Sequence, residues 1–191
     1  NWAGLLQGLA RTDAPLDQRD RDGATLLTLA ARQGRLDVVS ELLRRGAQPD
    51  RVGLYGLSPL GAAALGGHDL VVQALLRAGA DPLRWSGAGQ APVHLAARGG
   101  HARTLRILQA GGADLMQFNC EGRHALAEAA RTGQIEAMAW LLEQAQVPVN
   151  APDLNGLTAV HAAALGRHFE AVQWLQQRGA ELQHPLTPVL I

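Results

Sequence analysis

The fold is decided by residues 89–97, which read Gly-Gln-Ala-Pro-Val-His-Leu-Ala-Ala. A near copy, Gly-Leu-Thr-Ala-Val-His-Ala-Ala-Ala, occupies residues 156–164. The same frame of a glycine, an apolar residue four positions later and an alanine pair begins again at Gly23, Gly56 and Gly122, so successive copies lie 33, 33, 33 and 34 residues apart. A period of this length is typical of repeat architectures, so the sequence predicts stacked units rather than one domain with a central core.

The period divides the chain into five units and two ends. Residues 1–16 match the second half of a unit, so we expect an N-terminal capping half-repeat, anchored by Trp2. Residues 183–191 are too short for another unit and are expected to form a C-terminal tail that covers the last unit or leads into more chain. The predicted units are residues 17–49, 50–82, 83–115, 116–149 and 150–182.

Each unit is predicted to be a turn followed by two short antiparallel helices. Two residues after the glycine, Thr25 and Ser58 carry hydroxyls that can cap the following helix. Pro59 falls in the first turn of such a helix, where a missing N–H costs nothing. A later glycine, such as Gly34, permits the left-handed exit that ends the first helix. A helix pair of this size cannot bury its apolar face alone, so we expect neighbouring pairs to stack.

These motifs resemble the ankyrin repeat, whose pattern Gly-x-Thr-Pro-Leu-His-x-Ala-Ala is followed by Gly-His and then by Leu-Leu-x-x-Gly-Ala-Asp. Residues 89–97 follow the first part, and Gly100-His101 and Gly112-Ala113-Asp114 complete it. The resemblance covers nearly the whole chain. It implies an all-α ankyrin-repeat solenoid of stacked helix-turn-helix units with β-turn fingers. It also implies a concave surface, formed by the turn tips and the exposed ends of the first helices, that binds other proteins.

Two units depart from the pattern. Arg167 stands where the other units have the glycine that ends the first helix, which should cost about 1 kcal/mol or shift the cap. Unit four has Ala145 in place of a glycine and one extra residue in the following Gln146-Val147-Pro148-Val149. We expect the loop between units four and five to be irregular, and to be either a weak point or a specialised contact.

Composition excludes several classes of function. Seventeen basic residues balance seventeen acidic ones in a chain of 191 residues, so a broad nucleic-acid-binding surface is not expected. Every basic residue is arginine, which excludes lysine Schiff-base and Walker-type phosphate chemistry and, as a sign of GC-rich coding, favours a bacterial source. The single cysteine excludes an intramolecular disulfide framework.

The sequence also bears on location. No apolar stretch approaches the roughly 18 residues that span a bilayer, so we expect a soluble chain without membrane insertion. A cytoplasmic location is slightly favoured. The chain begins at Asn1 rather than at a methionine, so a periplasmic or secreted location stays open if a signal peptide has been removed.

No catalytic, metal-binding or cofactor-binding site is expected. His94 and His161 occupy the motif position whose imidazole, the resemblance implies, ties adjacent loops together. The other histidines fall at repeat positions, at a cap or in the tail, and not in a metal-binding spacing. Cys120 lies at a predicted turn tip, and no base is specified for it. A metal- or thiol-dependent enzyme would require histidine or cysteine side chains to converge in space.

The positions that the repeat leaves free are the candidates for specificity. Apolar residues occupy three consecutive turn tips, and leucine, tyrosine and arginine follow at neighbouring free positions. Tyrosine, tryptophan and arginine dominate interface hot spots, although some of these side chains could instead fold back onto the next turn. Trp140 and Trp174 belong to the second helices and are expected to pack between units. The predicted partner-binding residues are Val52, Leu54, Tyr55, Leu57, Leu65, Trp85, Arg98, Phe118, Arg123 and Arg131.

The sequence therefore predicts a non-enzymatic scaffold for protein–protein interaction, with a partner whose surface is apolar and acidic. The more specific hypothesis is an inhibitor or immunity partner of a bacterial toxin or hydrolase. The alternative is a regulatory or targeting module of a larger enzyme or multidomain protein. The full reading frame would separate them, since a signal peptide and a stop soon after Ile191 favour the inhibitor and a further domain favours the module.

Overall fold

The computed structural model describes residues 16–182. The capping half-repeat expected at the N-terminus, with Trp2, and the tail expected from residue 183 onward therefore lie outside the described residues, apart from Leu16. None of the described helices is long and apolar enough to cross a membrane.

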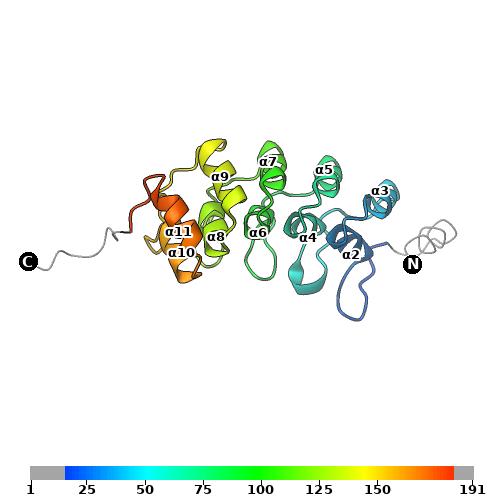
Figure 1. The fold of residues 1–191 in the computed structure, drawn as a ribbon. Helices are drawn as coiled ribbons and strands as arrows, with labels where there is room; N and C mark the ends of the chain where they lie inside the picture. The colour runs from blue at the N-terminus through cyan, green and yellow to red at the C-terminus, as the bar shows by residue number, and fades with distance from the viewer. Residues whose placement is uncertain (1–15, 183–191) are drawn as a thin grey trace, which may run out of the picture.

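The described chain is a stack of helix pairs without named strands, which confirms the predicted all-α class (Figure 1). A single isolated β-bridge joins Arg19 to Thr25, and one short 3-10 turn, η1 (Leu54–Gly56), precedes the second pair. The pairs are α2 (Leu26–Arg32) with α3 (Leu36–Arg44), α4 (Pro59–Leu65) with α5 (Asp69–Arg77), α6 (Pro92–Gly99) with α7 (Ala102–Ala110), α8 (Ala125–Arg131) with α9 (Ile135–Glu143), and α10 (Ala159–Leu165) with α11 (Phe169–Gln176).

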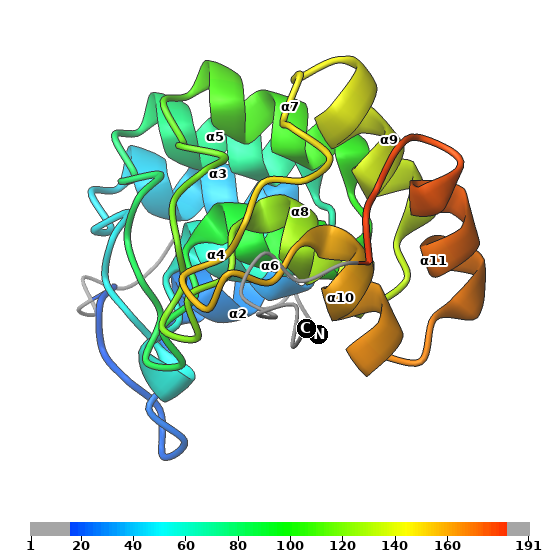
Figure 2. The same ribbon diagram turned by 90° about the vertical axis from the view of Figure 1, so that its left-hand side faces the viewer.

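The helices form two layers, one of first helices and one of second helices (Figure 2). Each first helix packs against the next first helix along the chain, from α2 to α10. The alanine pairs of the first four of these helices are buried, and in α10 Ala163 is buried while Ala164 is exposed. Small side chains at these positions let neighbouring helices approach closely. The second helices α3, α5, α7 and α9 also pack in order, but α9 and α11 are less closely packed than any other neighbours in that layer.

The ends of the first helices follow the chemistry that the sequence predicts. The Thr25 hydroxyl accepts a hydrogen bond from the Thr28 N–H at 3.2 Å, and the Ser58 hydroxyl accepts one from the Gly61 N–H at 3.0 Å. Both are N-caps that satisfy a backbone donor at the start of a helix. The predicted caps at Thr25 and Ser58 are therefore confirmed.

Left-handed backbone recurs three times in each unit, and it is almost always carried by glycine. Arg167 and Gln146 occupy two of these repeating positions, with φ of 60° and 56°. Tyr55, with φ of 56°, is the one left-handed residue of the described chain outside the repeating positions. Helix α10 still ends at Leu165, so Arg167 adopts the strained conformation instead of shifting the cap.

The loop between units four and five is irregular, as expected. The Ala145 N–H bonds to the Trp140 carbonyl, five residues back, and the Val147 N–H bonds to the Leu141 carbonyl, six residues back. In a regular unit the equivalent closing bond spans five residues, as between Ala80 and Leu75. The extra residue is therefore absorbed by a wider turn after α9.

The two tryptophans of the second helices lie against the core. Trp140 and Trp174 are partly buried against the hydrophobic core. The Arg178 guanidinium lies 3.7 Å from the centre of the Trp174 ring, and Arg178 also pairs with Glu143 at 3.3 Å. These contacts join the C-terminal end of α11 to that of α9.

Candidate partner-binding surface

Five loops precede the first helices, and we call them fingers 1 to 5: residues 19–25, 52–58, 85–91, 118–124 and 152–158. Fingers 1 to 3 project below the first helices in Figure 1. Neighbouring fingers are joined by backbone hydrogen bonds. The donors are the amides of Gly87, Cys120 and Leu154, and the acceptors are the carbonyls of Tyr55, Gly89 and Gly122, at 2.9, 3.0 and 2.9 Å. Fingers 2 to 5 are thus held edge to edge.

Buried imidazoles fix the fingers to the helices. Nδ1 of His94 accepts a hydrogen bond from the Ala91 N–H, and its Nε2 donates to the Gln117 carbonyl at 2.8 Å. This pattern requires a neutral ring that carries its proton on Nε2. His161 likewise reaches from α10 to the Leu182 carbonyl at 2.9 Å, which confirms the loop-tying role expected of His94 and His161.

His124 makes a similar connection from the capping position of α8. Its Nδ1 lies 3.4 Å from the Ala127 amide, and its Nε2 lies 3.2 Å from the Ala151 carbonyl. Burial lowers the pKa of both His94 and His124, because a charged ring would lose its hydration. Both rings therefore serve as neutral structural ties.

Two of the predicted finger residues, Tyr55 and Trp85, are exposed. The exposed fraction of Tyr55 is 80% and that of Trp85 is 46%. Val52 is partly buried, and so is Phe118, whose ring centre lies 6.3 Å from that of His124. The alternative of folding back onto the structure therefore applies to Phe118. Leu54 lies in η1.

An apolar hollow of about 240 Å³ lies beside Tyr55, between the first two helix pairs. The repeat explains this hollow, because Ala62 stands at the position that leucine occupies in the two flanking units, at Leu29 and Leu95. We call it the Ala62 hollow. Its lining residues are Ala24, Thr28, Leu29, Arg32, Tyr55, Leu57, Ala62 and Leu65.

The hollow unites only part of the predicted site. Tyr55, Leu57 and Leu65 line it together, whereas Trp85 and Phe118 are not among its lining residues. Sequence reasoning missed Ala62 and Arg32, although the repeat offered a signal for each. Ala62 is a small residue between the leucines of the two flanking units, and Arg32 shares the helix-end position of Arg98.

The predicted arginines differ in their surroundings. Arg123 and Arg131 both pair with Glu128, at 2.7 and 3.1 Å, and Asn119 donates a third hydrogen bond to the same carboxylate. Glu128 is completely buried, and Arg123 also pairs with Glu121. Burial by itself raises the pKa of Glu128, but the bonds and charges of Arg123 and Arg131 outweigh it, so that pKa lies below its ordinary value.

Glu128 therefore neutralises much of the basic charge expected at this end of the surface. Arg98 is exposed and forms no ion pair with the acidic residues that the structure describes. Arg32 is likewise exposed and unpaired with described carboxylates. Among the arginines at the ends of the first helices, those whose charge is not neutralised by a described carboxylate are therefore Arg32 of α2 and Arg98 of α6.

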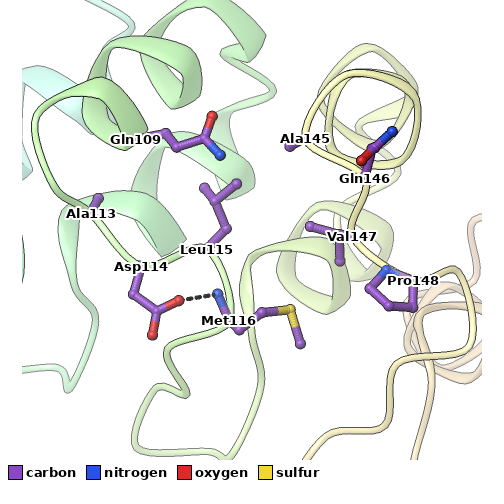
Figure 3. A pocket seen from close by; sticks show the side chains of 9 residues that line it. All are labelled: Gln109, Ala113, Asp114, Leu115, Met116, Ala145, Gln146, Val147 and Pro148. Atoms are coloured by element: carbon purple, nitrogen blue, oxygen red, sulfur yellow. Dashed lines mark hydrogen bonds between the residues drawn. The ribbon is translucent and has the colours of Figure 1, made fainter.

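A second pocket, of about 290 Å³, opens at the irregular loop (Figure 3). One wall is the segment Ala145–Pro148, and the other is the loop after α7, where an Asp114 oxygen accepts a hydrogen bond from the Met116 N–H at 2.8 Å. It shares no lining residue with the Ala62 hollow. Its lining residues are Gln109, Ala113, Asp114, Leu115, Met116, Ala145, Gln146, Val147 and Pro148.

Groups that could do chemistry do not cluster in the part of the chain that is described. No three histidine, cysteine, aspartate or glutamate side chains lie together there in a way that could hold a metal ion. The Cys120 thiol is exposed and lies 3.3 Å from the Ala88 carbonyl.

Comparison with known families gives two matches. A family described as ankyrin repeats (3 copies) matches residues 3–85 and 93–185. A second, described as ankyrin repeats (many copies), matches residues 62–109. Neither is a catalytic family, and no curated protein matches the sequence.

Proposed function

Since the chain belongs to the ankyrin-repeat family, we propose that it is a non-enzymatic scaffold whose protein partner docks on the fingers and first helices. Ankyrin-repeat domains generally bind proteins and are typically non-catalytic. The observation that carries the proposal is Tyr55, 80% exposed at the rim of an apolar hollow. Exposed apolar surface of this kind marks partner sites on soluble proteins, and tyrosine is a frequent hot-spot residue.

The partner that we propose is a bacterial toxin or hydrolase, which the scaffold inhibits or to which it confers immunity. Fingers that are hydrogen-bonded edge to edge support this role, because a preorganised surface loses little entropy on binding and can hold a partner tightly. The arginine-only basic composition supports a bacterial source. The remaining positive charge at Arg32 and Arg98 favours an acidic rim on the partner.

The test is capture from a lysate of the source organism. The immobilised wild-type chain is compared with Tyr55→Ala and Trp85→Ala, and bound proteins are quantified by mass spectrometry. Leu70→Ala is the matched control, because Leu70 is a large apolar residue with an exposed fraction of 59% in a second helix. The expected result is a protein held by wild type and Leu70→Ala, with binding weakened by about 2 kcal/mol or more in the finger variants.

Titration of the purified partner then measures affinity, and circular dichroism confirms that each variant is folded. Equal affinity of all four chains would refute the proposed surface. A partner that proves to be a catalytic domain of the same polypeptide would replace the inhibitor role with that of a regulatory module.

A further inference from the structure

The Ala62 hollow has the form of a socket for a single side chain. Leu29 forms part of its wall, and Ala62 leaves room where the flanking units place leucine. The neighbouring Gly61 also lacks room for a side chain, since a Cβ there would lie 3.1 Å from Leu57 Cδ1 and 3.2 Å from Leu95 Cδ1. The socket is therefore set by the absence of large side chains in one unit, and it is already open in the unbound chain.

The polar groups of the lining residues are the side chains of Thr28 and Arg32 and the hydroxyl of Tyr55, and the rest of the lining is apolar. Thr28 is already engaged, because its hydroxyl lies 2.8 Å from that of Thr25. Arg32 thus supplies the free charge at the mouth. Asp20, on the adjacent finger, already accepts hydrogen bonds from two backbone amides of its own turn.

Arg98 provides a second positive charge at a defined separation. It occupies the same helix-end position as Arg32, two first helices further along the stack. Packed helices lie about 8 to 10 Å apart, so the two positions are separated by roughly 16 to 20 Å. An extended chain advances about 3.3 Å per residue, which makes this distance about five or six residues.

We infer that the Ala62 hollow receives one apolar side chain of an extended acidic segment of the partner, with two carboxylates that pair with Arg32 and Arg98. The inference rests on the proposed function, since it names the part of the partner that docks. Side chains on alternate residues of an extended segment face the same side. The two acids should therefore lie about six residues apart, with the apolar residue at an even spacing between them and nearer to the acid at Arg32.

The test begins with a phage-displayed library of random peptides, selected on the wild-type chain and counter-selected on Ala62→Leu. That substitution restores the leucine of the flanking units and fills the hollow. The expected peptides carry an apolar residue and two acids in even register. Fluorescein-labelled versions are then titrated by fluorescence anisotropy, and Ala62→Leu should weaken binding about tenfold or more.

Ala162→Leu is the matched control, because Ala162 occupies the same position in the last unit and does not line the hollow. It should leave affinity within about twofold of wild type, as expected for a change outside the contact surface. A double variant, Arg32→Glu with Arg98→Glu, alters exposed residues only. It should lose the acidic peptides and, in a new selection, enrich peptides with lysine or arginine at the same spacing.

Three outcomes would overturn the inference: unchanged affinity of Ala62→Leu, selected peptides without acids, or no peptide enriched over Ala62→Leu. In the last case, a partner that is still captured through Tyr55 and Trp85 would leave the proposed function standing. If Ala62→Leu does not fold, the charge-reversed variant decides, since failure to exchange acidic for basic peptides refutes the pairing.

Discussion

Three non-glycine residues of the described chain have left-handed backbone, and they differ in meaning. Gln146 and Arg167 stand at positions where other units have glycine, so each carries strain that belongs to the repeat. Tyr55 has no counterpart, and its conformation places an aromatic side chain at the rim of the Ala62 hollow. Strain of this kind collects at functional sites, which supports Tyr55 as a contact residue.

Arg167→Gly should stabilise the chain by about 1 kcal/mol, because glycine adopts positive φ without a steric cost. The measurement is urea denaturation followed by circular dichroism. Arg167→Ala is the control, since it removes the side chain but keeps a Cβ. Equal gains from both substitutions would attribute the effect to the arginine side chain and not to the backbone.

Glu128→Gln should destabilise the chain by about 2 kcal/mol, because it removes the charge that satisfies Arg123 and Arg131. Glu143→Gln is the control, since that carboxylate is half exposed and its pair with Arg178 should contribute less than about 0.5 kcal/mol. Urea denaturation of both variants gives the comparison. A loss no larger than that of the control would mean that finger 4 is held by other contacts.

At the scale of the elements, fingers and helices are joined by neutral imidazoles. Because burial lowers the pKa of His94 and His124 in the folded chain, the unfolded chain binds more protons just below its own histidine pKa of about 6.5. The contribution of these two histidines to the free energy of unfolding is therefore complete above about pH 6.5 and declines as the pH falls through that value. This pH range lies above the range in which Glu128 acts, because the stability that the Glu128 carboxylate contributes begins to be lost only near the unfolded glutamate pKa of about 4.3.

The melting temperature should thus be lower at pH 5.5 than at pH 7.5, as measured by differential scanning calorimetry. His124→Ser keeps a capping side chain, like Ser58 in unit two, and should reduce the difference between the two pH values. His94→Thr makes the same test with the residue that unit one has at that position, Thr28. A pH dependence identical to wild type in both variants would contradict this assignment.

The sequence predicts the elements better than the surface between them. Helix order, caps and the irregular loop follow from local residues such as Ser58 and Ala145, so the pattern alone was sufficient. The Tyr55 side of the Ala62 hollow depends on the backbone of η1, and no sequence pattern marks Tyr55 as left-handed. The pairing of Arg123 with Glu128 likewise depends on how finger 4 folds over α8, a distance that repeat spacing does not encode.

On the scale of the whole molecule, the stack has no single centre, so its stability is a sum of unit and neighbour terms. Leu108 and Leu175 are equivalent, fully buried residues of α7 and α11. Replacing either with alanine should remove about 2 to 5 kcal/mol locally. The consequences should differ, because α7 has packed neighbours on both sides and α11 is packed less closely against α9.

Leu108→Ala should lower one cooperative transition, whereas Leu175→Ala should let α10 and α11 open before the rest. Hydrogen exchange with mass spectrometry, at increasing urea, distinguishes the two by the order in which amides of residues 159–176 lose protection. Equal protection of those amides and of the central units in Leu175→Ala would refute independent opening of the last pair.

The extra residue after α9 also changes the spacing of the repeat along the chain. Left-handed residues at the ends of the second helices fall at Gly46, Gly79 and Gly112, separated by 33 residues, and then at Gln146, 34 residues later. The loop is therefore the one place among these four where the spacing of the repeat changes. Duplication or loss of one 33-residue period between Gly46 and Gly112 leaves the spacing of the remaining units unchanged. Recombination in the gene can therefore lengthen or shorten the surface in this part of the stack. A crossover at the loop that contains Gln146 transfers the additional residue as well, so the irregular spacing is carried into the new position.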